Sequence, residues 1–349
     1  MHPFIHWTCG RLARLRSWRV VARGAGACAR YGLAAIAALT ASHAAAEYNP
    51  CDFSGGDEAC KVQGGEYRVL KPAGEGPFPV AVYLHGSLGE ADIVYNSGRM
   101  RQAIVNRGYV LLVPRALDVV NYTVGRGTGW SLRAREDHPR DDIGFLRNVL
   151  DHVEREYRID RRRVILLGQS DGGFLIWEIA CHEPGFAAAY ASHAGSYGGP
   201  LPSRCGSPAR FLQTHGRRDT TVPFENIRMS PDGRRLSSAN PLEGLDLLAR
   251  ANGCEPRGEV PVTQYQSFDR TQWRECGNKA ALEYWVHGGG HGYPGHWISA
   301  VLDWFETFDL EPPKPGQRVV RKVGQPSEAK AGRFKSVSGT TRFKAVPKN

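Results

Sequence analysis

The pentapeptide Gly168-Gln169-Ser170-Asp171-Gly172 places one serine between two glycines. The apolar, partly β-branched run 164–167 precedes it, and an apolar stretch with helical potential, 174–180, follows. A strand that turns sharply into a helix exposes the serine hydroxyl, and glycines on either side remove the collisions that side chains would cause in such a turn. The spacing therefore predicts that Ser170 is a nucleophile.

A serine hydroxyl becomes reactive when a base takes its proton and a carboxylate holds that base. Asp219 and His291 follow Ser170 in the chain, and each comes shortly after an apolar run that is typical of a strand. This order predicts a catalytic triad of Ser170, Asp219 and His291 at one edge of a sheet. Asp232 is the alternative acid, and His287 and His296 are the alternative bases.

The negative charge that develops during acyl transfer needs two hydrogen-bond donors. The backbone amide of Asp171 is the first candidate, because it opens the helix that follows the serine. The second should come from the loop after the strand 79–84, where the amide of Ser87 is preferred and that of Gly86 is the alternative. Trp130 and Tyr293 are candidate walls of a substrate pocket, and packing in the core or on the surface is the competing interpretation for both.

Alternating strands and helices must position these residues. The pattern predicts an edge strand at 66–70 and buried strands at 79–84, 109–113, 164–167, 186–190, 210–214 and 282–286. It predicts helices at 100–106, 141–157, 174–180, 242–251 and 297–308. We therefore expect an α/β fold with a mainly parallel central sheet and helices on both faces. The long connection 115–139 and the polar insertion 226–241 interrupt this pattern, and a connection as long as 115–139 is usually functional.

The net charge of +10 is carried by the two ends of the chain. Residues 1–46 contain six arginines and no acid, and 312–349 contain six lysines, four arginines and one glutamate, which leaves −5 for 47–311. A mildly acidic body argues against nucleic-acid binding.

The distribution of charged, apolar and small residues along the chain predicts its domain organisation. It predicts a signal peptide at 1–46, one catalytic domain at 47–311 and a disordered basic tail at 312–349. The tail could also tether the protein weakly to an anionic surface.

Six cysteines remain after the predicted signal peptide, an even number that favours disulfides in an exported chain. Pairing of nearest neighbours is the simplest of the fifteen possible arrangements. It would join Cys51 to Cys60, Cys181 to Cys205 and Cys254 to Cys276. The sequence has no Cys-x-x-Cys motif, so no thiolate zinc site is indicated. We expect neither a metal ion nor a cofactor.

Several motifs together resemble those of esterases related to polyhydroxybutyrate depolymerase and to feruloyl or acetylxylan esterase. They are His-Gly-Ser at 85–87, Asp-Asp-Ile-Gly-Phe-Leu at 141–146, the segment 168–173, His-Gly-x-x-Asp-x-x-Val-Pro at 215–223 and Gly-Gly-Gly-His-x-x-Pro-Gly at 288–295. The resemblance covers about residues 60–308. It implies an α/β-hydrolase fold, secreted ester hydrolysis, the triad named above and a Cys254–Cys276 disulfide. The sequence departs from the pattern at Tyr293, where relatives often carry Trp, and at Asp171, where they often carry Asn.

These observations predict a secreted or periplasmic, monomeric serine esterase that forms an acyl-enzyme on Ser170. Its substrates would be small or oligomeric esters of the hydroxyalkanoate or polyhydroxybutyrate type. Feruloyl or acetylxylan esters of plant cell walls are the alternative substrates. A peptidase of the same fold is disfavoured, because no propeller or lid domain is present. The alternative outside the enzymes is a non-catalytic, surface-binding protein built on a hydrolase scaffold.

Overall fold

The computed structural model describes residues 59–121, 125–132, 140–206, 208–223, 239–256, 261–277 and 279–310. All of them belong to one compact unit, 44–349. The predicted signal peptide, the predicted tail, Cys51 and Asp232 lie outside the described residues, as does most of the insertion 226–241. The predictions for these segments therefore remain predictions.

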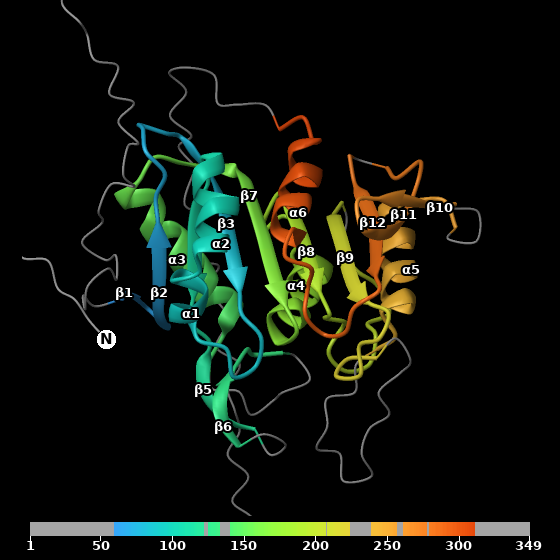
Figure 1. The fold of residues 1–349 in the computed structure, drawn as a ribbon, viewed down its shortest axis with the longest axis horizontal. Coiled ribbons are helices and arrows are strands. Elements are labelled where there is room, and N and C mark those ends of the chain that lie inside the picture. Colours follow the sequence, from blue (N-terminus) through green and yellow to red (C-terminus); the bar gives the residue numbers. More distant parts are fainter. Residues whose placement is uncertain are drawn as a thin grey trace, which may run out of the picture. The chain divides into compact units, whose positions relative to one another are not determined.

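A ten-stranded sheet forms the centre of this unit (Figure 1). In chain order its strands are β1 (Cys60–Val62), β2 (Gly65–Leu70), β3 (Phe78–Leu84), β4 (Val110–Pro114), β7 (Ile159–Gln169), β8 (Ala189–His193), β9 (Arg210–Gly216), β10 (Val262–Tyr265), β11 (Phe268–Gln272) and β12 (Ala281–His287). Across the sheet they lie in the order β1-β2-β4-β3-β7-β8-β9-β12-β11-β10. The six strands from β4 to β12 pair in parallel, and the outer strands on each side pair antiparallel.

The helices cover both faces of the sheet (Figure 1). They are α1 (Ala91–Tyr95), α2 (Gly98–Ile104) with the short 3-10 helix η1 (Val105–Arg107), α3 (Asp142–Glu156), α4 (Asp171–His182), α5 (Pro241–Asn252) and α6 (Trp297–Glu306). Side chains of α3, α4 and α5 pack into the core on one face. Side chains of α1, α2 and α6 pack into the core on the other face. The expected α/β arrangement with helices on both faces is confirmed.

The central strands are apolar without interruption because both of their faces are buried. In β7, Val164 and Leu166 belong to the core beneath α3, α4 and α5, whereas Ile165 and Leu167 belong to the core on the opposite face. Local signals fix the helix ends. The Asp141 side chain caps α3 by accepting a hydrogen bond from the Gly144 amide at 3.0 Å, and Gly253 ends α5 in the left-handed conformation.

The structure differs from the sequence prediction at several places. β2 is not an edge strand, because β1 pairs with it on its outer side. The strand expected at 186–190 begins at Ala189, since the Phe186 amide donates a hydrogen bond to the Glu183 carbonyl in a turn. The connection 115–139 contains a separate two-stranded sheet made of β5 (Leu117–Asn121) and β6 (Gly125–Gly129). We call this pair the β5–β6 hairpin.

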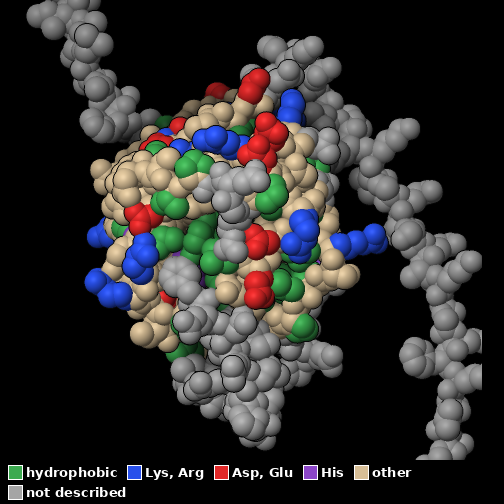
Figure 2. Space-filling view, turned by 90° about the vertical axis from the view of Figure 1, so that its right-hand side faces the viewer, with side chains coloured by type: hydrophobic (Ala, Val, Ile, Leu, Met, Phe, Trp, Pro, Cys, Tyr) green, Lys and Arg blue, Asp and Glu red, His purple; other side chains and the backbone are tan. Residues whose placement is uncertain are grey.

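Two of the three expected disulfides are present, Cys181–Cys205 and Cys254–Cys276. Cys60 is buried, and its pairing with Cys51 stays a prediction. On the face shown in Figure 2, acidic and basic side chains of the described residues are interspersed. Within the described ranges, no helix has the length and apolarity that crossing a membrane requires.

Candidate active site

Ser170 occupies the turn between β7 and α4. Its backbone has φ 53° and ψ −119°, a conformation that costs a residue with a side chain about 1–3 kcal/mol. The Ser170 amide donates a hydrogen bond to the carbonyl oxygen of His193 at 2.9 Å, which anchors the turn to the end of β8. Its side chain is partly exposed. The predicted strand–turn–helix context of Ser170 is therefore present.

The two glycines beside Ser170 allow the turn to pack tightly. A Cβ atom at position 168 would lie 2.6 Å from the carbonyl oxygen of Gly172. A Cβ atom at position 172 would overlap the carbonyl oxygen of Leu84, the last residue of β3. Glycine at both positions thus lets α4 start directly against the ends of β3 and β7.

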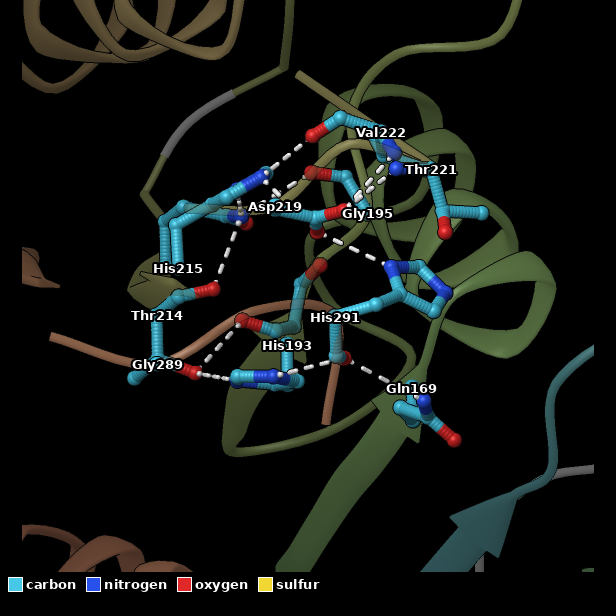
Figure 3. A network of polar contacts seen from close by, with 12 residues as sticks. Gln169, His193, Gly195, Thr214, His215, Asp219, Thr221, Val222, Gly289 and His291 are labelled. Carbon is cyan, nitrogen blue, oxygen red and sulfur yellow. Dashed lines mark hydrogen bonds and ion pairs between the residues drawn. The ribbon is translucent and has the colours of Figure 1, made fainter. Parts of the chain in front are cut away.

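Asp219 and His291 meet as the sequence predicts (Figure 3). The Nδ1 atom of His291 lies 2.9 Å from Oδ2 of Asp219. The Asp219 side chain is fully buried, whereas that of His291 is 24 % exposed. Because an ionised carboxylate can only accept, Nδ1 of His291 carries the hydrogen and Nε2 presents its lone pair. His291 can therefore accept a proton at Nε2.

Four donors face the Asp219 carboxylate. Besides His291, the amides of Thr221 and Val222 each donate to Oδ1 at 2.9 Å. Nε2 of His215 lies 3.3 Å from Oδ2 and shares its hydrogen with the Val222 carbonyl oxygen at 2.7 Å. Burial alone would raise the pKa of Asp219, but hydrogen bonds from His215, His291 and the Val222 amide hold this pKa below its usual range. The carboxylate is consequently ionised throughout the neutral pH range.

The other candidate bases lie elsewhere. Nδ1 of His287 accepts a hydrogen bond from the Gly289 amide at 3.0 Å, and Nε2 of His296 pairs with the Ser267 hydroxyl at 2.9 Å. Neither side chain hydrogen bonds to Asp219. Among the described residues, His291 is thus the histidine that joins Asp219 to the region of Ser170.

The loop that carries His291 approaches the nucleophile turn. The His291 carbonyl oxygen lies 3.5 Å from Nε2 of Gln169, the residue before Ser170. Within the described residues, the Ser170 hydroxyl makes no hydrogen bond to His291. Catalytic hydrogen bonds are often long without substrate and tighten when it binds.

The loops that carry Asp219 and His291 also touch through their backbones. The Arg217 amide donates to the His287 carbonyl at 2.8 Å, and the Arg218 amide donates to the Gly289 carbonyl at 2.9 Å. A Cβ atom at position 216 would overlap the carbonyl oxygen of Gly290. Glycine at 216 therefore permits this contact between the two loops.

The Gly86–Ser87 peptide lies against Ser170, since a Cβ atom at position 86 would be 3.2 Å from Cβ of Ser170. Its carbonyl accepts hydrogen bonds from Nδ1 of His85 at 2.9 Å and from the Gly89 amide at 3.0 Å. A trans peptide points its N–H away from its carbonyl, so these bonds also fix the direction of the Ser87 amide. That amide donates to no acceptor among the described residues, and it is available to an anionic oxygen.

Trp130 links the two sides of the anion site that the sequence predicts at the amides of Ser87 and Asp171. Its backbone amide donates to Oδ2 of Asp171 at 3.0 Å, and its indole Nε1 donates to the His85 carbonyl at 2.8 Å. The β5–β6 hairpin adds two more bonds to the same loop, from the Leu88 amide to the Thr128 carbonyl at 3.1 Å and from the Thr128 hydroxyl to the Gly89 carbonyl at 2.6 Å. The hairpin and Trp130 therefore hold the loop that contains Ser87.

The two predicted pocket residues have different surroundings. Trp130 has no exposed surface, so its placement supports a role beneath the anion site and gives no support to a pocket wall. Tyr293 is partly buried. Its ring packs on Trp297 at a centroid distance of 4.8 Å, and its hydroxyl pairs with the Tyr83 hydroxyl at 3.1 Å. Its role in substrate binding remains a prediction.

Sequence reasoning missed several residues that build the site. His193 and Gln169 contact the His291 backbone, and His215 contacts Asp219. The His-Gly-x-x-Asp motif contained the signal for His215, whereas a single histidine at the end of β8 gives no comparable signal. Among the described residues, no group of three or more His, Cys, Asp or Glu side chains is placed to hold a metal ion.

A comparison with protein-family models found no match. NocK of Nocardia uniformis subsp. tsuyamanensis, whose name describes it as an esterase, is 26 % identical over 235 residues, which cover 62 % of this chain and 66 % of NocK. Feruloyl esterase D of Neurospora crassa is 28 % identical over 170 residues, which cover 48 % of this chain and 51 % of that protein. The chain thus spans between one half and two thirds of these relatives.

Among solved structures, acetyl xylan esterase from Aspergillus awamori has a similar fold, with a TM-score of 0.53 and 18 % sequence identity. The match covers 69 % of this chain and 93 % of that one. Together with the parallel sheet, the covering helices and the turn at Ser170, this similarity shows the fold class. The chain has the α/β-hydrolase fold and is related in sequence to proteins named as esterases.

Proposed function

We propose that the protein is a serine esterase that hydrolyses carboxylic esters through an acyl-enzyme on Ser170. The observation that carries this proposal is the hydrogen bond of 2.9 Å between His291 and the buried Asp219, beside a serine in a strained strand-to-helix turn. Relatives that are named esterases support the same reaction class.

In the first half of the reaction, Oγ of Ser170 attacks the ester carbonyl carbon while Nε2 of His291 takes the hydroxyl proton. Asp219 stabilises the resulting imidazolium. The amides of Ser87 and Asp171 donate to the oxyanion of the tetrahedral intermediate. Collapse of the intermediate breaks the ester C–O bond, and His291 returns its proton to the departing alcohol.

In the second half, a water molecule enters where the alcohol left. His291 takes a proton from this water as its oxygen attacks the acyl carbon of the acyl-enzyme. The same two amides bind the second oxyanion. Collapse releases the carboxylic acid and returns the proton to Ser170, so that no cofactor is consumed.

The relatives favour one substrate class within this reaction. Because one is named a feruloyl esterase and another a bifunctional acetylxylan esterase/xylanase, we place feruloyl or acetyl esters of cell-wall sugars first. Hydroxyalkanoate oligomers are the second class. Two disulfides fit an exported enzyme, secreted or periplasmic.

A substrate panel with a covalent probe tests the proposal. The purified protein is assayed on p-nitrophenyl esters, methyl ferulate, acetylated xylan and hydroxybutyrate oligomers, and it is treated with a fluorophosphonate probe. We expect turnover of the p-nitrophenyl esters and labelling that disappears in Ser170→Ala. A folded wild-type protein that is neither labelled nor active would favour the non-catalytic, surface-binding alternative.

A further inference from the structure

His193, the last residue of β8, lies beside the loop that carries the proposed base, His291 (Figure 3). Its backbone carbonyl accepts the hydrogen bond of the Ser170 amide at 2.9 Å. Its side-chain Nε2 lies 3.3 Å from the backbone carbonyl oxygen of His291. One residue therefore holds the nucleophile turn through its main chain and the His291 loop through its imidazole.

The imidazole of His193 is neutral. Its burial, assisted by the nearby His287 and His215, lowers its pKa to about 3. A neutral imidazole carries one hydrogen, and a carbonyl oxygen can only accept, so this hydrogen is on Nε2. Nδ1 lies 2.9 Å from the hydroxyl oxygen of Thr214 on β9, and this hydroxyl also lies 3.3 Å from the Ser192 carbonyl oxygen, so its one hydrogen is shared between two acceptors. The carbonyl of His291 therefore selects the tautomer, and the Thr214 hydroxyl is compatible with it.

Aromatic rings confine the imidazole on several sides. His287 stacks on it at a centroid distance of 5.4 Å, and Tyr293 and Trp297 meet it edge to face at 5.5 Å each. The side chain has no exposed surface. A ring that is packed on these sides and hydrogen bonded at both nitrogens cannot swing away from the His291 carbonyl.

The loop that His193 holds requires such an anchor. The segment 288–292 reads Gly-Gly-Gly-His-Gly, so His291 has glycines on both sides. Glycine restricts the backbone least of all residues. The bond from Asp219 fixes the His291 ring. The backbone that carries the ring is held by separate contacts: the Arg218 amide binds the Gly289 carbonyl, and at the His291 carbonyl His193 is closer, at 3.3 Å, than Gln169, at 3.5 Å.

We propose that His193 is a positioning residue whose Nε2–H holds the His291 backbone at a fixed distance from the turn that carries Ser170. The proposal rests on the proposed serine-esterase function. Loss of this bond should lower kcat, because His291 acts in both halves of the reaction, and should leave KM nearly unchanged. Displacements of about 1 Å in an active site can cost on the order of 100-fold in rate.

A matched pair of substitutions separates the two nitrogens. The amide nitrogen of glutamine can replace Nε2, whereas that of asparagine reaches only to the place of Nδ1. In assays with p-nitrophenyl butyrate, we expect His193→Asn to lower kcat by about 10- to 100-fold with KM changed less than threefold. We expect His193→Gln to retain at least a third of the wild-type kcat. His152→Asn is the control, since His152 bonds to Tyr67 away from the site.

A spectroscopic readout tests the positioning without reference to activity. The hydrogen between Nδ1 of His291 and Asp219 should give a downfield proton NMR signal, which is assigned by its loss in His291→Ala. We expect the signal to broaden or shift in His193→Asn and to return in His193→Gln. A wild-type protein without esterase activity would contradict the proposed function, whereas the NMR comparison would still decide the role of His193.

The positioning role is overturned if folded His193→Asn keeps both the wild-type kcat and the NMR signal, or if His193→Gln is as impaired as His193→Asn. Circular dichroism and thermal unfolding establish folding. If His193→Asn does not fold, Thr214→Val takes its place, because it removes the hydroxyl that contacts Nδ1 of His193 and nearly preserves the shape of the side chain. A decrease in kcat of threefold or more supports the proposal, and an unchanged kcat contradicts it.

Discussion

Each reactive group of the candidate site depends on the few atoms around it. The buried carboxylate of Asp219 remains ionised because four donors replace the water it has lost. Strained backbone at Ser170 is held by a hydrogen bond to His193. Such local arrangements fix which atoms donate and which accept before a substrate arrives.

The first prediction concerns the triad. Ser170→Ala and His291→Ala should each lower kcat on p-nitrophenyl butyrate by about 10⁴–10⁶, because triad members act as a unit. Asp219→Asn should cost about 10⁴, because an amide favours the wrong tautomer of His291. Stopped assays at high enzyme concentration measure the residual rates, and circular dichroism checks the fold.

A folded Ser170→Ala protein that keeps more than a hundredth of the wild-type turnover would contradict the serine-esterase proposal. If His291→Ala alone remains active, the base is another histidine, and His287→Ala and His296→Ala become the next variants to assay.

At the scale of elements, the β5–β6 hairpin and Trp130 hold the loop 85–89. Three bonds connect them to this loop: indole to His85 carbonyl, Leu88 amide to Thr128 carbonyl, and Thr128 hydroxyl to Gly89 carbonyl. This loop carries the Ser87 amide. A segment without a place in the central sheet thus holds the loop that carries the proposed oxyanion donor.

We expect Trp130→Phe to lower kcat by about tenfold, which is less than the loss of a whole oxyanion donor. The indole bond disappears and leaves the buried His85 carbonyl without this donor, which should lower the free energy of unfolding by about 1–3 kcal/mol. Steady-state kinetics and urea unfolding measure the two effects.

Trp304→Phe is the matched control, because the buried indole nitrogen of Trp304 has no hydrogen-bond partner in the part of the chain that the structure describes. It loses similar volume without losing a bond. Equal decreases of kcat in the two variants would show that the bond from Trp130 to the His85 carbonyl does not matter for the reaction.

The sequence correctly predicted the strands and helices with a clear apolar pattern. It did not predict elements whose conformation depends on packing against distant parts of the chain. The apolar runs of β3, β4 and β7, the nucleophile turn and two disulfides were predictable from local signals. The β5–β6 hairpin was not, because glycines at 125, 127 and 129 are typical of loops. In the structure Gly127 packs against the end of the Leu88 side chain, which would have to shift if position 127 carried a side chain.

The candidate site shows the same division. Chain order was enough to identify Ser170, Asp219 and His291 as residues that could meet at the sheet edge. The contacts of His193 could not be predicted from the sequence, because they depend on where the glycine-rich loop of His291 lies relative to the end of β8. Trp130 looked like a pocket wall because the sequence did not show that its loop folds back beneath the anion site.

For the whole molecule, stability should depend on pH through histidines that are buried in the neutral form. Burial lowers the pKa of His85 and His287 and lowers that of His193 to about 3. The unfolded chain takes up protons near pH 6.5, while folded His193 does not. Protons therefore bind preferentially to the unfolded state, and stability falls as pH falls between about 6.5 and 3.

We expect each such histidine to contribute up to about 1.4 kcal/mol per pH unit to this slope. Urea unfolding at several pH values between about 5.5 and 7 measures it, a range in which the depressed pKa of Asp219 adds almost no slope because that group is ionised in both states. His193→Gln should reduce the slope by up to about 1.4 kcal/mol per pH unit, which corresponds to the uptake of one proton. An unchanged slope would show that folded His193 does take up a proton in this range.

Thiol titration tests the predicted covalent framework. Cys181–Cys205 connects the end of α4 to the loop before β9, and Cys254–Cys276 connects the end of α5 to the loop before β12. In the unfolded, unreduced protein that begins at residue 47, we expect no free thiol, because Cys51 and Cys60 form the third pair. Two or more free thiols would contradict this pairing. Loss of a native disulfide typically costs about 2–5 kcal/mol.

The backbone contact at Gly216 limits which substitutions the loops of this site can accept during evolution. Because a side chain at 216 would overlap the carbonyl oxygen of Gly290, a substitution there would displace the loop of the base as well as that of the acid. The β5–β6 hairpin instead contacts the loop of Leu88. We therefore expect new substrate preferences to arise from substitutions in the hairpin and in the loop of Leu88. The segments around 216 and 290 should change least over evolutionary time.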